Sequence, residues 1–139
     1  ISMKINGPPN ASSLKTKIRE LCQGTSNGLR ATDQQKILVE DLAEQLCKYN
    51  PTKKPAKSGL MKGKWKMIYS NVPGPSSGRI GPFIGNVFQD LQPENKRIYN
   101  LLELGPSWAL RGALEADLEI LDDENWAITF DFVYNKFNG

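Results

Sequence analysis

The chain changes from a helical to an alternating pattern of hydrophobic residues at about residue 63. Beyond that point, large apolar side chains recur at every second position and lysines occupy the positions between them. This period of two is typical of a strand with one covered and one solvent-facing side. The pattern predicts a strand over residues 63–70, with Trp65, Met67 and Tyr69 on one side and Lys64 and Lys66 on the other.

The residues before this strand predict a pair of amphipathic helices over 13–50. Apolar residues three and four positions apart form a stripe in each half of the segment. Thr32 and Gln35 have the spacing of a capping box, so the second helix begins there, and Pro51 ends it. We expect an irregular arm at 1–12 and a Lys- and Pro-rich linker at 51–59.

Strand patterns continue after residue 70. They predict strands over residues 83–91, 97–104, 108–121 and 126–135. The 108–121 segment also fits a helical pattern, but six apolar residues at alternate positions favour a strand. In the last strand the alternation predicts that all large apolar residues point the same way, namely Trp126, Ile128, Phe130, Phe132 and Tyr134.

These elements together predict one α+β domain. Two N-terminal helices would pack on an antiparallel sheet formed by residues 60–139. A chain of 139 residues is long enough to bury one hydrophobic core. No apolar run approaches the ~20 residues that a membrane span needs, so we expect any membrane contact to be peripheral.

The charge is unevenly distributed along the chain. Residues 1–70 carry 13 basic and 5 acidic side chains, whereas residues 71–139 carry 5 and 10. A group of lysines lies in a stretch without acids: Lys53, Lys54, Lys57, Lys62, Lys64 and Lys66. This group predicts a surface for anionic lipid or an acidic partner, or else simply a solvated linker and strand face. Nucleic acid is not expected, because arginines and aromatic residues are not interleaved with these lysines.

The residue types present argue against catalysis. The chain has no histidine, which excludes Ser-His-Asp and Cys-His catalytic groups, and no metal site is expected. Cys22 and Cys47 lie on the apolar stripes of the predicted helices, so both are expected to be small core residues. A disulfide between them is the alternative. We therefore expect a protein that is not an enzyme.

Three motifs resemble one known family. These are Gly63-Lys64-Trp65 followed by Tyr69, the run from Gly81 to Asp90, and Gly28-Leu29-Arg30-Ala31-Thr32 before a helix. The first is similar to the opening strand of lipocalins, and the three together resemble the plastid lipid-associated proteins, also called fibrillins. The resemblance implies a lipocalin-like β-barrel that binds apolar molecules in plastids, on thylakoid membranes or plastoglobules. The absence of Met at position 1 fits a mature form after removal of a targeting segment, or a trimmed chain.

The number of predicted strands is too small for a closed barrel. Five strands are fewer than the ~8 of a closed ligand-holding barrel, so the barrel is expected to be incomplete or open. The expected role is that of a carrier for a lipid, carotenoid or quinone, with no other cofactor. The predicted ligand wall consists of Trp65, Met67, Tyr69, Phe88, Leu114, Phe130 and Phe132. The same residues could instead form a packed core, and the alternative role is a structural subunit docked on a photosystem or antenna complex.

Overall fold

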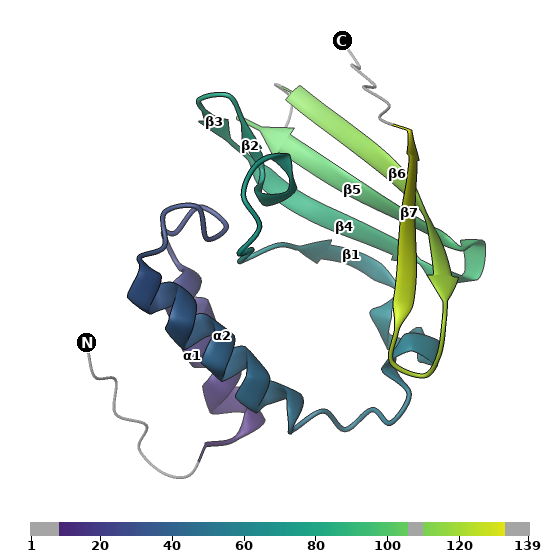
Figure 1. Ribbon diagram of the computed structural model, residues 1–139, viewed down its shortest axis with the longest axis horizontal. Helices are drawn as coiled ribbons and strands as arrows, with labels where there is room; N and C mark the ends of the chain where they lie inside the picture. Colours follow the sequence, from purple (N-terminus) through teal and green to yellow (C-terminus); the bar gives the residue numbers. More distant parts are fainter. Residues whose placement is uncertain (1–8, 106–109, 133–139) are drawn as a thin grey trace.

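The computed structural model describes residues 9–105 and 110–132, which form two helices and two antiparallel sheets (Figure 1). The helices are α1 (Ala11–Cys22) and α2 (Asp33–Cys47). The larger sheet has the order β1-β4-β5-β6-β7, and β2 and β3 form a separate hairpin. The strands are β1 (Gly63–Lys66), β2 (Arg79–Ile80), β3 (Phe83–Ile84), β4 (Asn86–Gln92), β5 (Arg97–Leu104), β6 (Leu110–Ile120) and β7 (Trp126–Phe132). Within the described ranges this sheet is open, so the α+β prediction and its open-barrel form are confirmed.

Both helices begin at capping boxes that their sequences encode. In α2, Thr32 Oγ1 accepts from the Gln35 N–H at 3.2 Å and Gln35 Oε1 accepts from the Thr32 N–H at 2.9 Å, as predicted. In α1 the capping residue is Asn10, whose Oδ1 accepts from the Ser13 N–H at 2.9 Å. The first helix therefore begins at Ala11, two residues before the predicted start.

The two helices pack mainly against each other, burying Leu14 and Cys22 of α1 and Val39 and Leu42 of α2. Figure 1 shows them beside the sheet, near the end of β1, so neither face of the sheet lies beneath them. The expectation that they cover the sheet is wrong, because their apolar stripes meet each other. Both thiols are free, and Cys47, at the end of α2, is exposed, so only Cys22 is the predicted core residue.

The five-stranded sheet has one well-buried side, which we call the inner face. It carries Val87 and Leu91 of β4, Ile98 of β5, and Ala116 and Leu118 of β6, all between 1% and 6% exposed. Four of these residues form a cluster against which Trp126 packs: Leu91, Ile98, Ala116 and Leu118. The opposite side, the outer face, carries charged residues between scattered apolar ones, as alternation in antiparallel strands requires.

The 108–121 segment is a strand where the structure describes it, which confirms the choice of alternation over helical spacing. Its pairing with β7 contains a bulge, because Asp117 pairs with Thr129 whereas Glu115 pairs with Phe132. The additional residue in β7 interrupts the period of two. The backbone pairing therefore places Phe132 opposite Glu115, whereas Ile128 lies opposite Leu118, and Tyr134 lies outside the described residues.

The predicted first strand is shorter than expected. β1 ends at Lys66, although the Met67 N–H still donates to the Val87 carbonyl at 2.9 Å. The chain then turns toward the helices, where the Ser70 N–H donates to the Asn27 carbonyl at 2.9 Å. Residues 67–70 thus connect the sheet to the helix pair.

The segment predicted as a linker, residues 51–59, closes one end of the inner face. It includes a short 3₁₀ helix, Pro55–Lys57, and a second one begins at Gly59. Ala56 is buried, and its N–H donates to the Asp123 carbonyl at 3.0 Å. The Trp126 indole N–H donates to the Ala56 carbonyl at 2.8 Å, which fixes this segment to the last strand. The β2–β3 hairpin stands at the opposite end of the sheet (Figure 1).

Candidate ligand-binding face

Large apolar side chains remain exposed on the inner face beyond its buried cluster. Trp65 is 49% exposed, Ile128 42% and Phe130 52%. Trp65 belongs to this face because it pairs with Gln89, which lies between the buried Val87 and Leu91. Ile128 belongs to it because it pairs with the buried Leu118. An exposed apolar surface inside a curved sheet is unusual for an isolated domain and is typical of a binding site.

The Trp65 ring is held in place by a single polar contact. Its indole N–H donates to the Met61 carbonyl at 2.9 Å. Met61 is the last residue of the second 3₁₀ helix, Gly59–Met61. The segment that closes one end of the inner face therefore also orients the exposed ring at its edge.

Two amides lie at the centre of the inner face. Gln89 pairs with Asn100, and these residues pair in turn with Trp65 on one side and Leu114 on the other. The Asn100 Oδ1 atom is buried and has no hydrogen-bond partner among the described residues. A buried carbonyl oxygen normally accepts a hydrogen bond, so the Asn100 Oδ1 atom is an unsatisfied acceptor.

The seven residues predicted as a ligand wall do not share one surface. Trp65 and Leu114 lie on the inner face, and the alternation of β7 before its bulge adds Phe130. Phe88 lies on the outer face, where it pairs with Lys66 and Leu101 and where the Lys64 ammonium group is 4.4 Å from its ring centroid. Phe132 pairs with Glu115 across the bulge.

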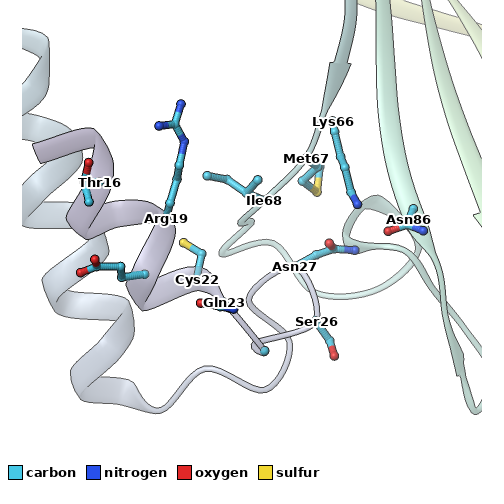
Figure 2. A pocket seen from close by; sticks show the side chains of 12 residues that line it. Thr16, Arg19, Cys22, Gln23, Ser26, Asn27, Lys66, Met67, Ile68 and Asn86 are labelled. Carbon is cyan, nitrogen blue, oxygen red and sulfur yellow. The ribbon is translucent and has the colours of Figure 1, made fainter. Parts of the chain in front are cut away.

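Met67 and Tyr69 lie at the junction between the sheet and the helices. Met67 lines a cleft of about 520 Å³ whose other side is formed by α1 residues, including Arg19 and Cys22 (Figure 2). Tyr69 packs beneath the loop that follows α1, and burial raises the pKa of its hydroxyl, with smaller contributions from Glu40 and Cys22. The register of β4 thus places Phe88 away from the inner face, and the turn after β1 does the same for Met67 and Tyr69.

Four of the six predicted surface lysines have acidic partners. Lys54 and Lys57 contact Asp123 at 3.3 and 2.5 Å, and Lys62 contacts Glu94 at 2.6 Å. The Lys64 ammonium group lies 3.9 Å from a Glu103 oxygen. Lys66 lines the cleft beside α1 and Lys53 is exposed. These lysines therefore join the basic first half of the chain to acids of the second half.

These contacts alter two carboxyl groups. Hydrogen bonds from Lys57 and Lys54 lower the pKa of Asp123, and a hydrogen bond from Lys62 lowers the pKa of Glu94. Burial raises the pKa of the Cys22 thiol, which disfavours the reactive thiolate.

No cluster of three potential metal ligands occurs among residues 9–105 and 110–132. No helix in the described part of the chain is long and apolar enough to cross a membrane.

Sequence reasoning missed the residues that hold the helix pair to the sheet. Asn27 Nδ2 donates to the carbonyls of Ser77 and Gly85 at 3.0 and 2.9 Å. Gly28 passes so close to the chain that a Cβ atom would lie 2.5 Å from the Ser70 carbonyl oxygen. The Asn-Gly dipeptide is a turn motif that points to this loop. The polar residues Gln89 and Asn100 were also detectable, because each interrupts an apolar alternation.

The sequence is similar to known proteins over most of its length. Residues 12–136 match the PAP_fibrillin family. A curated relative, "Probable plastid-lipid-associated protein 5, chloroplastic" from Arabidopsis thaliana, is 23% identical over 124 residues, which cover 88% of this chain and 51% of the relative. The chain thus spans about half the length of that curated relative. No solved structure matches the chain.

Proposed function

Since the chain belongs to the PAP/fibrillin family, we propose that it is a non-catalytic plastid protein that binds apolar molecules on the inner face of its open sheet. Lipids, carotenoids and quinones are the candidate ligands. The name of the relative, plastid-lipid-associated and chloroplastic, supports both the compartment and the lipid class.

The exposed apolar surface of the inner face carries this proposal. Burial of one large apolar side chain contributes about 1.5–3 kcal/mol. A ligand that covers Trp65, Ile128 and Phe130, each about half-exposed, would remove the remaining apolar area of these three side chains from water together with its own apolar area. The buried cluster lies on the same face, so the exposed side chains continue an apolar surface.

A fluorescence titration with 12-(1-pyrenyl)dodecane tests the proposal. Ile128→Asn should weaken binding by about tenfold or more, because it places an amide where the ligand needs an apolar contact. The matched control is Ile37→Asn, since Ile37 is also exposed, at 67%, but lies on α2, away from the sheet. Absence of binding by the natural chain, or equal weakening by both substitutions, would contradict the proposal.

A second candidate role is that of an interaction subunit on a photosynthetic membrane complex. Within the described ranges, β1 and β7 each pair with one neighbour only, so each has an edge that could accept a strand from another protein. A subunit of this kind would bind the pyrene probe poorly when purified and would comigrate with a photosystem or antenna complex in native gels. Strong probe binding without any partner favours the carrier.

The location on thylakoid membranes or plastoglobules is likewise part of the proposal. The β2–β3 hairpin supports contact with a lipid surface, because Phe83 and Ile80 at its tip are 65% and 46% exposed beside the cation Arg79. This combination of exposed apolar side chains and a neighbouring positive charge suits anionic lipid headgroups with acyl chains beneath them.

A further inference from the structure

A glycine lies on the inner face within the 11-residue strand β6. Gly112 pairs with Leu102 of β5, and Leu114 is the next residue of β6 on the same face. Glycine weakens the interior of a strand, because it loses more conformational entropy on folding than any other residue and has no side chain to pack. A glycine at this position therefore requires an explanation.

The described part of the chain does not supply that explanation. The pairing of β5 with β6 continues without a shift past Gly112, so no bulge between these strands requires a glycine. Its φ is not left-handed, and no described atom lies within 4 Å of the position that a Cβ atom would occupy. Gly85 differs, because a Cβ atom there would lie 2.3 Å from the Glu103 carbonyl oxygen. The fold thus requires a glycine at residue 85, whereas no described contact requires one at residue 112.

The missing side chain leaves a strip of bare backbone in an apolar surface. Leu102 and Leu114, both half-buried, border this strip across the sheet and along the strand. The peptide groups on either side of Gly112 are planar, so the strip is flat. A planar ring can lie in contact with it over its whole width, whereas an acyl chain is thin enough to lie between side chains elsewhere on the face. A glycine inside a strand often marks such a close approach of a ligand to the backbone.

The exposed apolar residues of β7 lie farther along the sheet. Ile128 pairs with Leu118, which is six residues from Gly112 on β6, or about 20 Å at the rise of a strand. A ligand that contacts both Gly112 and Ile128 must therefore be elongated. Trp126, the next inner-face residue of β7 beyond Ile128, is fixed to Ala56 and closes that end of the face. The wider part of such a ligand consequently has room at the Gly112 end.

We propose that Gly112 determines the ligand specificity of the inner face. The ligand class is an elongated apolar molecule with a planar ring at one end, whose ring lies flat on the backbone at Gly112 and whose chain extends toward Ile128. Any side chain at residue 112 would lift the ring away from the backbone. This inference rests on the proposed function and assigns a ligand class to the same site.

Two neutral fluorescent probes test the inference in titrations of the full chain. The first, 12-(1-pyrenyl)dodecane, has a planar ring system at one end, and the second, the methyl ester of cis-parinaric acid, is a conjugated acyl chain without a ring. Gly112→Val should weaken binding of the pyrene probe by about tenfold, because an apolar site discriminates by that order over one or two carbon atoms. It should weaken binding of the acyl probe by less than about twofold, since a thin chain is displaced more easily than a ring.

Ala113→Val is the matched control. Ala113 is the next residue of β6, but it pairs with Leu101 on the outer face, so its replacement should leave both affinities unchanged. Valine favours strands, so both variants should withstand urea at least as well as the natural chain. A loss of binding is then distinguished from a loss of folding. Gly112→Ala gives the same readout, with a smaller loss, where the valine variant fails to fold.

The outcomes separate the two proposals. If the pyrene probe binds the natural chain and Gly112→Val equally, or if Ala113→Val weakens it as much, the role of Gly112 is overturned while the proposed function stands. If Gly112→Val weakens both probes alike, the ring-bearing ligand class is overturned. If neither probe binds the natural chain, the proposed function itself fails and the inference about Gly112 fails with it.

Discussion

Gly28 is the residue at which the helix pair and the sheet approach most closely. Its φ is +91°, and a Cβ atom there would lie 2.5 Å from the Ser70 carbonyl oxygen and 2.9 Å from the Tyr69 ring. An alanine would combine an unfavourable backbone conformation with a clash against backbone. The sequence indicated a turn at this position, but the partners of the turn, Tyr69 and Ser70, are more than 40 residues away and could not be identified from a local pattern.

Gly28→Ala should lower the free energy of unfolding by about 3 kcal/mol, measured by urea denaturation. Gly59→Ala serves as the control, because nothing lies within 4 Å of its Cβ position and its φ is not left-handed. The control should change stability by less than about 0.5 kcal/mol. Equal effects of the two substitutions would show that the close approach of Gly28 is unimportant.

Asp123 makes part of the stability dependent on pH. Its pKa is lowered in the folded chain from the ordinary value of 3.8, mainly by hydrogen bonds from Lys57 and Lys54. A lowered carboxyl pKa stabilises the folded state above the unfolded pKa, and this contribution is lost as the pH falls through the lowered value. The effect is modest because the ion pairs are solvent-accessible.

Urea denaturation of the natural chain and of Asp123→Asn between about pH 6 and pH 2.5 measures this contribution. The natural chain should be the more stable at the upper end, and the two stabilities should converge as the pH falls below 3.8. A constant difference across the whole range would mean that Asp123 titrates as it does in the unfolded chain.

At the scale of elements, the sequence predicted those whose signals are local. The second helix has a complete capping box, and β5 (Arg97–Leu104) has the predicted bounds because turn residues flank it on both sides. The β2–β3 hairpin was missed, since each strand has only two residues, too few to show alternation. The bulge in β7 was also missed, because it arises from pairing with β6.

For the candidate site, the sequence correctly separated apolar from polar positions but not one sheet face from the other. Trp65 and Leu114 are inner-face residues, whereas Phe88 is on the outer face because its neighbours Val87 and Gln89 point inward. Whether the odd-numbered or the even-numbered residues of β4 point to the inner face depends on the pairing of β4 with β5. That register is a long-range property, so Phe88 could not be placed from its own segment.

The exposed hairpin tip gives a prediction at this scale. Phe83→Ser should reduce sedimentation with vesicles of phosphatidylglycerol and galactolipid by about fivefold, because one large apolar side chain no longer enters the acyl region. Leu60→Ser is a matched control, since Leu60 is 71% exposed against 65% for Phe83 but lies at the other end of the sheet. If Leu60→Ser is equally damaging, the hairpin is not the contact element.

At the scale of the whole molecule, the helix pair and the sheet are two bodies that lie side by side and are joined by few contacts. Asn27 provides part of this junction through its two hydrogen bonds to the Ser77 and Gly85 carbonyls. The helices bury their apolar residues against each other, so they are able to separate from the sheet without losing their own packing. The sequence could not show this arrangement, because amphipathic helices that cover a sheet carry the same stripe.

Asn27→Ala should therefore loosen the helix pair more than the sheet. Backbone amides of α1 are expected to exchange hydrogen about tenfold faster, while those of β5 should change less. Asn95→Ala is the control, since Asn95 is an exposed turn residue whose Nδ2 donates to Gln92 at 3.1 Å. Uniform acceleration in both elements would indicate that helices and sheet unfold as one unit.

The contact between Ala56 and Trp126 has a consequence for synthesis of the chain. The two residues are 70 positions apart, and the buried cluster that Trp126 covers is incomplete without it. A ribosome that has not yet released residue 126 therefore holds a chain in which this contact cannot form and the cluster is uncovered on the side of β7. The cluster can be completed only after β7 has emerged, so its apolar residues are exposed to chaperones and proteases until that point.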